Sequence, residues 1–303
     1  MRVLFLILIF FSSFNLCSQT YGAYVIDATA LYQAKAYKES ASLWDKAFQI
    51  HPGFASDYYN AACTAALAGY TKTAFGYLEE AISHGWEDIA WLQQDPDLAV
   101  LKESENWSDF NDAIPALKTD YLSSLNLELK NQLEDLRMQD QTIRLLLPDA
   151  ETRFGRESKA YNWFRNELMP RNDSIVLNRI ITLIDENGWP GIQEVGELAN
   201  QTLWLVIQHA PLKIQKNYLP LLEKSVNEGE SKARYLAFLL DRILMREDQK
   251  QIYGTQSLWD TTKKQNVIWP ILNPHEVNQR RKEVGLESVE EYAKTNGFLY
   301  TQD

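Results

Sequence analysis

The segment 122–147 places a carboxylate inside a stripe of apolar residues. Leucine and isoleucine recur there every three or four residues, and Asp140 occupies the one gap in the stripe. Because this spacing puts side chains on one face of a helix, we expect Asp140 to be buried and to pair with Arg144, four residues later. Burying a carboxylate without a partner lowers the stability of the folded protein, so Asp140 needs one. The pair is either a structural bridge or a carboxylate held at the floor of a pocket.

A second acid and arginine interrupt another apolar segment. Asp241 and Arg242 lie within 235–245, which otherwise reads as a buried helix that opens near Ser231. A single charge pair of this kind is usually structural. Two such pairs in one domain, together with a histidine, predict a polar pocket between helices.

The histidine is His209, at the end of the segment 203–211. Five apolar residues precede Gln208 and His209, and Pro211 ends the helix that this segment predicts. The apolar run predicts a buried helix, so we expect its last turn to be enclosed as well. His209 is then either a core residue that bonds a backbone carbonyl or an imidazole delivered to a site, where it could transfer protons near neutral pH.

The segment 249–259 differs from the helices around it. It is rich in β-branched and aromatic residues, contains Gly254, and is followed by the similar segment 266–270, which predicts a two-stranded hairpin. Its polar side chains do not alternate cleanly with apolar ones, and we expect them to contact a ligand. A helix after Asn273 carries Arg280, Arg281 and Lys282, which we interpret as a solvated helix face, with Arg281 also a candidate for ligand binding.

The candidate site residues fall into two groups. The candidate catalytic residues are His209, Asp140 and Asp241. The candidate ligand-binding residues are Gln141, Arg144, Gln208, Arg242, Tyr253, Thr255, Gln256 and Arg281. We predict no metal site and no cofactor, because the chain has no HExxH, no paired CxxC, no phosphate-binding glycine loop and no GxSxG nucleophile motif.

Two functions remain open from the residues alone. The first is a two-domain interaction protein: one domain holds a peptide or protein partner, and the polar pocket of the other binds a small ligand, an anionic one among the candidates, or a peptide. The second is a hydrolase or lyase in which His209 is the general acid or base, Asp140 or Asp241 orients it, and Arg144 and Arg242 bind the anionic substrate. The first is favoured, because no nucleophile or cofactor motif is present.

The motifs of the second half also carry a family resemblance. The series DQxxR from Asp140, GWP from Gly188, QHA from Gln208, DR from Asp241, QxYGTQ and RRxxVGL resembles an uncharacterised bacterial domain-of-unknown-function family. The resemblance covers roughly residues 120–295. It implies a recognisable module, often exported and sometimes preceded by helical repeats, without an assigned activity.

The first third of the chain repeats itself. Between residues 28 and 82, small residues recur at a spacing of 34, as with Ala28 and Ala62, and Trp44 matches Leu78. This pattern resembles the tetratricopeptide repeat, which implies pairs of helices and a surface for a peptide or protein partner. We expect residues 84–110 to cap the repeats through Trp86, Trp91, Leu98 and Phe110. Cys63 lies among alanines and is interpreted as a small core residue.

The chain begins with a basic residue, an apolar run over residues 3–11 and a short polar stretch. These features predict a signal peptide over residues 1–18 and a protein that is periplasmic or secreted. Cys17 would permit lipidation, but bulky Leu16 precedes it, so secretion is favoured over a lipoprotein. The apolar run is too short for a stable membrane span, which needs about 20 residues.

Taken together, the patterns predict a mainly α protein. A tetratricopeptide-like α-solenoid over residues 22–115 precedes a helical domain with a small β-hairpin over residues 120–303. The net charge of −11 argues against nucleic acid as a partner, because phosphate backbones are bound by basic surfaces.

Overall fold

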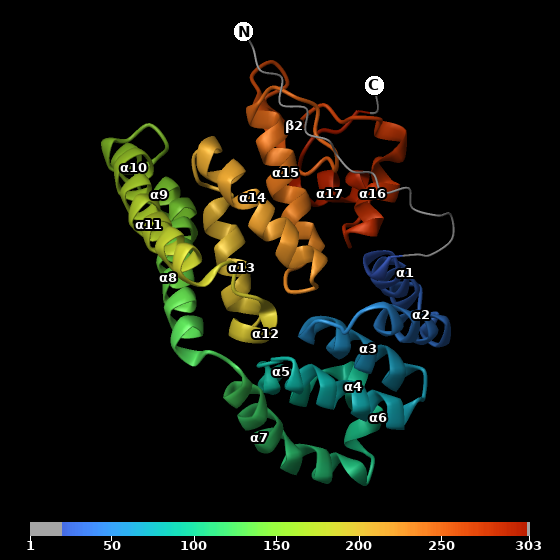
Figure 1. Cartoon of the computed structure of the whole chain (residues 1–303). Coiled ribbons are helices and arrows are strands. Elements are labelled where there is room, and N and C mark those ends of the chain that lie inside the picture. Colours follow the sequence, from blue (N-terminus) through green and yellow to red (C-terminus); the bar gives the residue numbers. More distant parts are fainter. Residues whose placement is uncertain (1–19, 302–303) are drawn as a thin grey trace.

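The chain folds into two groups of helices, as the computed structural model shows for residues 20–301 (Figure 1). The groups are joined covalently in the middle of the chain, and they also contact each other where the first helix of the chain meets a helix near its C-terminal end. The mainly α prediction is confirmed. The predicted signal peptide lies outside these residues. No helix between residues 20 and 301 combines the length and the apolar character that crossing a membrane requires.

The N-terminal group starts with two helical hairpins. Helix α1 packs against α2, and α3 against α4. Small buried side chains such as Ala28 and Ala61 let the helices approach, and Trp44 fills the space between the hairpins. The helices are α1 (Tyr21–Gln33), α2 (Tyr37–Ile50), α3 (Ala55–Leu67) and α4 (Thr71–Ser83).

Short helices cover the open side of the second hairpin. Leu98 and Phe110 are buried in its core and Trp86 packs against it, as predicted. Trp91 was expected to dock as well, but it is 50% exposed because its short helix buries Leu92 instead. The covering elements are α5 (Ile89–Gln94), η1 (Pro96–Leu98), α6 (Ala99–Lys102) and α7 (Asn106–Ser124).

The two groups are joined after α7, which is still helical through residues 115–120 although it contains Pro115. The apolar stripe of 122–147 therefore does not form one helix. The chain breaks at Leu125, and the side chain of Asn126 accepts a hydrogen bond from the Leu129 amide at 3.2 Å, which starts α8. The apolar stripe continues into the buried face of α8.

The second group surrounds α13, which packs against five other helices, α8, α11, α12, α14 and α15. Leu203 and Ile207 of α13 are fully buried at the centre of this core, which explains the apolar run in the sequence. The elements are α8 (Leu127–Leu145), α9 (Leu147–Phe154), α10 (Lys159–Trp163), a π-helical turn η2 (Phe164–Leu168), α11 (Met169–Asn187), α12 (Ile192–Val195), α13 (Glu197–Ile207), α14 (Leu212–Asn227) and α15 (Ala233–Arg246).

The remaining residues form a small mixed unit against α15. The predicted hairpin is present but shorter than expected, because its first strand spans Ser257–Asp260 only and residues 251–256 are not in a strand. Register pairs Ser257 with Ile268. The elements are β1 (Ser257–Asp260), β2 (Gln265–Ile268), η3 (Pro274–Glu276), α16 (Val277–Glu283) and α17 (Val289–Asn296).

The end of α16 touches the beginning of α1, so the two groups meet again far from their covalent junction (Figure 1). The Thr20 hydroxyl donates to the Glu283 carbonyl at 2.9 Å, and Lys282 pairs with Asp27 at 2.8 Å. Gly22 permits this approach, because its backbone lies against that of residues 283–285.

We expect Gly22→Ala to weaken this contact. A Cβ atom there would lie 2.6 Å from the Gly285 nitrogen and 2.8 Å from the Glu283 carbonyl oxygen, and neither backbone atom can rotate away. The free energy of unfolding should fall by about 1–3 kcal/mol. Gly76→Ala in α4 is the matched control, because no atom lies within 4 Å of its added Cβ. It should raise stability by about 0.5–1 kcal/mol. Equal effects at the two sites would contradict a tight α1–α16 contact.

Candidate functional site

Basic side chains of α8 and α15 act through their charges on His209, which lies just after the end of α13. We call Arg144 of α8, His209 just after α13, and Arg242 and Arg246 of α15 the arginine–histidine cluster. The charges of all three arginines and of Asp140 act on the imidazole of His209. Because α13 packs against both α8 and α15, tertiary packing places these charges within electrostatic reach of His209.

Asp140 and Arg144 form the contact that their spacing predicted. Asp140 is 2% exposed, and Arg144 donates to its two oxygens from Nε at 3.2 Å and from Nη2 at 3.0 Å. Arg144 also pairs with Asp173 of α11 at 2.9 Å, and Gln141 donates to Asp140 at 2.6 Å. The Asp140 carboxylate is therefore fully compensated, and it holds the Arg144 guanidinium in a fixed position.

His209 is exposed, although the sequence predicted an enclosed ring. The reason is that α13 ends at Ile207 and the chain tightens into a turn, where the His209 amide donates to the Val206 carbonyl at 3.1 Å. The preceding Gln208 remains buried.

The surroundings of His209 disfavour its protonated form. Desolvation by the nearby protein, followed by the positive charges of Arg144 and Arg242, lowers the pKa of His209 to about 4, and Asp140 acts in the opposite direction. Because the ring also faces solvent, water screens part of these charges. The imidazole is neutral at pH 7. An anion bound nearby would counter the positive charge of the arginines and raise the pKa of His209, which favours uptake of a proton.

Arg242 and Arg246 lie one turn apart on α15, and neither has an acidic partner among residues 20–301. The Arg242 Nε is buried without a hydrogen-bond partner in the same part of the chain. Arg246 donates to the Ala210 carbonyl at 2.5 Å. Burial lowers the pKa of both side chains, and the charge of Arg246 adds to the effect on Arg242. Like charges at this spacing destabilise a helix, so a bound anion would be favourable here.

Asp241 points into a different environment. It is fully buried, and its two oxygens accept hydrogen bonds from the amides of Ile252, Tyr253 and Thr255 and from the Thr255 hydroxyl, at 2.7–3.2 Å. Burial raises the pKa of Asp241, and these hydrogen bonds oppose the shift. All four donors belong to residues 252–255, so Asp241 holds this segment in place and does not join the arginine–histidine cluster.

Arg281 complements Asp241 from α16. It is fully buried, and it donates to the carbonyls of Glu287 at 2.6 Å, Tyr253 at 2.7 Å and Gly254 at 3.3 Å. The expectation of a solvated Arg280–Arg281 cluster is therefore wrong for Arg281, because the 253–254 backbone needs a donor for its carbonyls. Asp241 binds the amides of the segment and Arg281 binds its carbonyls.

Gln256 completes this network. The Gln256 backbone amide donates to the Gln251 Oε1 at 2.8 Å, and the Gln251 Nε2 donates back to the Gln256 backbone carbonyl at 3.0 Å. The predicted ligand-binding residues Tyr253, Thr255 and Gln256 thus shape the segment itself. This use of their polar groups also explains why the segment does not alternate like an ordinary strand.

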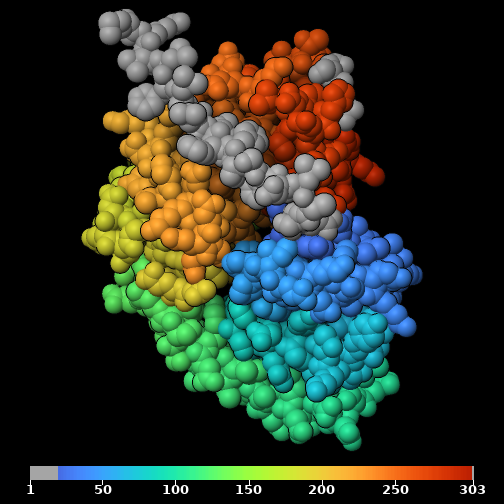
Figure 2. Space-filling model, turned by 45° about the vertical axis from the view of Figure 1, so that its right-hand side comes forward, coloured from blue at the N-terminus to red at the C-terminus, as the bar shows by residue number. Residues whose placement is uncertain are grey.

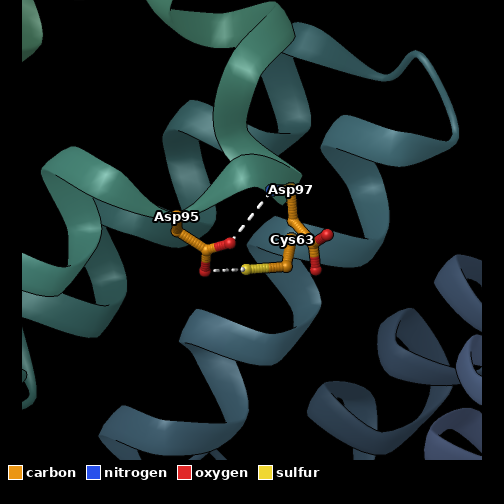
Figure 3. Close-up of side chains that lie close together, drawn as sticks. All are labelled: Cys63, Asp95 and Asp97. Carbon is orange, nitrogen blue, oxygen red and sulfur yellow. Dashed lines mark hydrogen bonds between the residues drawn. The ribbon is translucent and has the colours of Figure 1, made fainter.

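A separate group of potential metal ligands lies in the N-terminal helices, where Cys63, Asp95 and Asp97 are close together (Figure 3). Asp95 accepts hydrogen bonds from the Tyr59 hydroxyl at 2.7 Å, the Asp97 amide at 2.9 Å and the Cys63 thiol at 3.6 Å. Burial and the nearby charge of Asp95 raise the pKa of Cys63, so the thiol remains protonated. These groups satisfy one another where η1 begins, and Cys63 is the buried core residue that the sequence predicted.

Of the predicted site residues, the structure brings Asp140, Gln141 and Arg144 into contact, and the charges of Asp140, Arg144 and Arg242 act on His209. Arg246 was not among the residues predicted from the sequence. The only signal for it was its place four residues after Arg242, at the end of an otherwise apolar helix.

A model of a protein family of unknown function, DUF6624, matches residues 129–301. This match confirms the predicted relation to an uncharacterised family. No curated protein and no solved structure matches the chain.

Proposed function

The chain belongs to the DUF6624 family of unknown function, and we propose that it is an exported protein that binds a small anionic ligand in the arginine–histidine cluster. In this proposal the N-terminal hairpins are tetratricopeptide-like and present a surface for a peptide or protein partner. Export rests on the basic and apolar start of the sequence.

The unpaired arginines of α15 carry the proposal. Proteins normally pair or solvate a buried guanidinium, because leaving its donors unsatisfied costs free energy. Arg242 has a buried donor without a partner, and Arg246 places a second positive charge one turn away. His209 and Arg144 add donors from two other elements. A carboxylate, sulfate or phosphate group would supply the missing acceptors and offset the charge.

A hydrolase or lyase that uses His209 is the alternative. Two observations favour binding over this chemistry. First, a pKa near 4 leaves His209 poorly matched to proton transfer at neutral pH. Second, Asp241, one of the two carboxylates that would orient it, is occupied by residues 252–255. Asp140 remains the acidic group close enough to act on His209.

We expect sulfate to bind more tightly as the pH falls from 7 towards 5. The free imidazole has a pKa of about 4, and an anion beside it raises this value, so binding is coupled to uptake of a proton. Sulfate is a suitable probe because its own charge does not change over this range. Calorimetric titration of the full chain in buffers of different ionisation enthalpy measures both the affinity and the proton uptake.

His209→Gln is the matching variant. Glutamine retains hydrogen bonding but does not titrate, so we expect weaker sulfate binding with no proton uptake and little pH dependence. Stability provides a second readout. In the wild type, the low pKa of folded His209 favours the folded state above pH 6.5, and this contribution is lost as the pH falls towards 4. The His209→Gln protein should not lose this contribution to the free energy of unfolding between pH 6.5 and 4. Unchanged sulfate affinity in His209→Gln at every pH would overturn the assignment of His209 to the site.

A further inference from the structure

A cleft of about 500 Å³ lies where the two helical groups meet at α1 and α16. One wall comes from α1, the α2–α3 connection and α3. The other comes from the end of α14, the start of α15 and the end of α16. Figure 2 shows the blue N-terminal helices against the orange C-terminal helices on this face. The volume suits a small organic ligand.

Asp57 provides the negative charge of the first wall. Its carboxylate accepts a hydrogen bond from the Tyr21 hydroxyl at 2.5 Å and has no ion pair within 4 Å among the described residues. Burial raises the pKa of Asp57, and the positive charge of Lys232 opposes this shift. An ammonium group in the cleft would therefore be favourable beside this carboxylate.

Positive charges line the opposite wall. Lys232 lies 4.8 Å from the centre of the Phe54 ring, and it is already paired with Glu197. Arg234 is exposed at the start of α15 and has no acidic partner in the part of the chain that the structure describes. Arg234 is therefore the cation of the cleft that remains available to a ligand.

Apolar side chains also line the cleft. Val25 of α1, Phe54 before α3 and Val226 of α14 all line the cleft. A ligand with a positive end, a negative end and an apolar side chain would match these groups of the lining. A free anion would be repelled by Asp57, and a simple cation by Lys232 and Arg234.

We propose that this cleft binds a short zwitterionic peptide, with the ammonium group at Asp57, the carboxylate at Arg234 and an apolar side chain against Phe54. This site is distinct from the arginine–histidine cluster and goes beyond the function proposed above. Because its walls come from both helical groups, the peptide binds only while α1 and α16 remain in contact.

The test uses the full chain and three forms of one dipeptide. Leucyl-alanine carries both charges, its N-acetyl derivative lacks the ammonium group, and its C-terminal amide lacks the carboxylate. Calorimetric titration should show saturable binding of leucyl-alanine and at least ten-fold weaker binding of each capped form. No saturable binding of leucyl-alanine, or equal binding of the three forms, would overturn the proposal.

Two variants assign the charged ends. Asp57→Asn should bind leucyl-alanine and its N-acetyl derivative equally, because the group that recognises the ammonium is gone. Arg234→Gln should likewise bind leucyl-alanine and its amide equally. An Asp57→Asn protein that still prefers the free ammonium disproves the assignment.

Three controls separate binding from folding. Tyr21→Phe removes the hydrogen bond to Asp57 but retains the carboxylate, so the preference for the free ammonium should persist even if the protein is less stable. Asp45→Asn changes a carboxylate that also accepts from a tyrosine, Tyr77, but lies outside the cleft. It should bind all three forms as the wild type does. His209→Gln should leave dipeptide binding unchanged, so the two proposed sites can fail independently.

Discussion

Asp241→Asn should lower the free energy of unfolding by about 3–5 kcal/mol, the largest loss that we expect from a single isosteric change in this chain. The carboxylate accepts from three backbone amides and one hydroxyl in a fully buried position. An asparagine amide group would point its own hydrogens at some of these donors. Those donors would lose the acceptor that Asp241 supplies to them in the folded protein.

The measurement is chemical denaturation, combined with hydrogen exchange over residues 251–256, where protection should be lost first. Asp248→Asn is the control. Asp248 is exposed and has a φ of 58°, a conformation that asparagine tolerates well. Its effect should stay within about 0.5 kcal/mol. An Asp241→Asn protein with wild-type stability would show that the segment does not depend on the carboxylate.

Arg242→Met should reduce sulfate affinity by at least ten-fold while leaving the unliganded protein as stable as the wild type, or more stable by about 1 kcal/mol. Methionine retains an apolar stem at this position of α15 but removes the buried Nε and the repulsion from Arg246. Loss of binding with gain of stability is the result expected of a residue that is kept for a ligand.

Arg281→Met is the matched control, because the same replacement is made at another buried arginine. Arg281 donates to three backbone carbonyls, so its loss should destabilise the fold by about 2–4 kcal/mol. Sulfate affinity of the folded fraction should not change. If Arg242→Met instead destabilises the protein as Arg281→Met does, Arg242 has a structural role and the proposed anion site loses its main support.

Much of the local structure followed from the sequence. The burial of Asp140 and its pairing with Arg144 depend on residues four apart in one helix, and the apolar run before Gln208 made α13 central to the core. The hairpin was predicted in type but not in extent, because residues 251–256 are shaped by Asp241 and Arg281 and not by their own β propensity. The exposure of His209 was not predicted, because a single residue of turn after α13 moves the ring off the buried face.

The sequence by itself determined which segments are helical, which faces are apolar and which charges must find a partner, because these properties depend on neighbours within one turn. Only the tertiary structure decided which residues become those partners. Asp140 and Arg144 are four residues apart and form a local bridge, whereas Asp241 and Arg242 are adjacent and point to different neighbours. Asp241 turns to residues 252–255, and Arg242 joins His209 and Arg246 without an acid. The physical reason is that adjacent residues on a helix point about 100° apart, so the packing of α15 against its neighbours gives each residue a different environment.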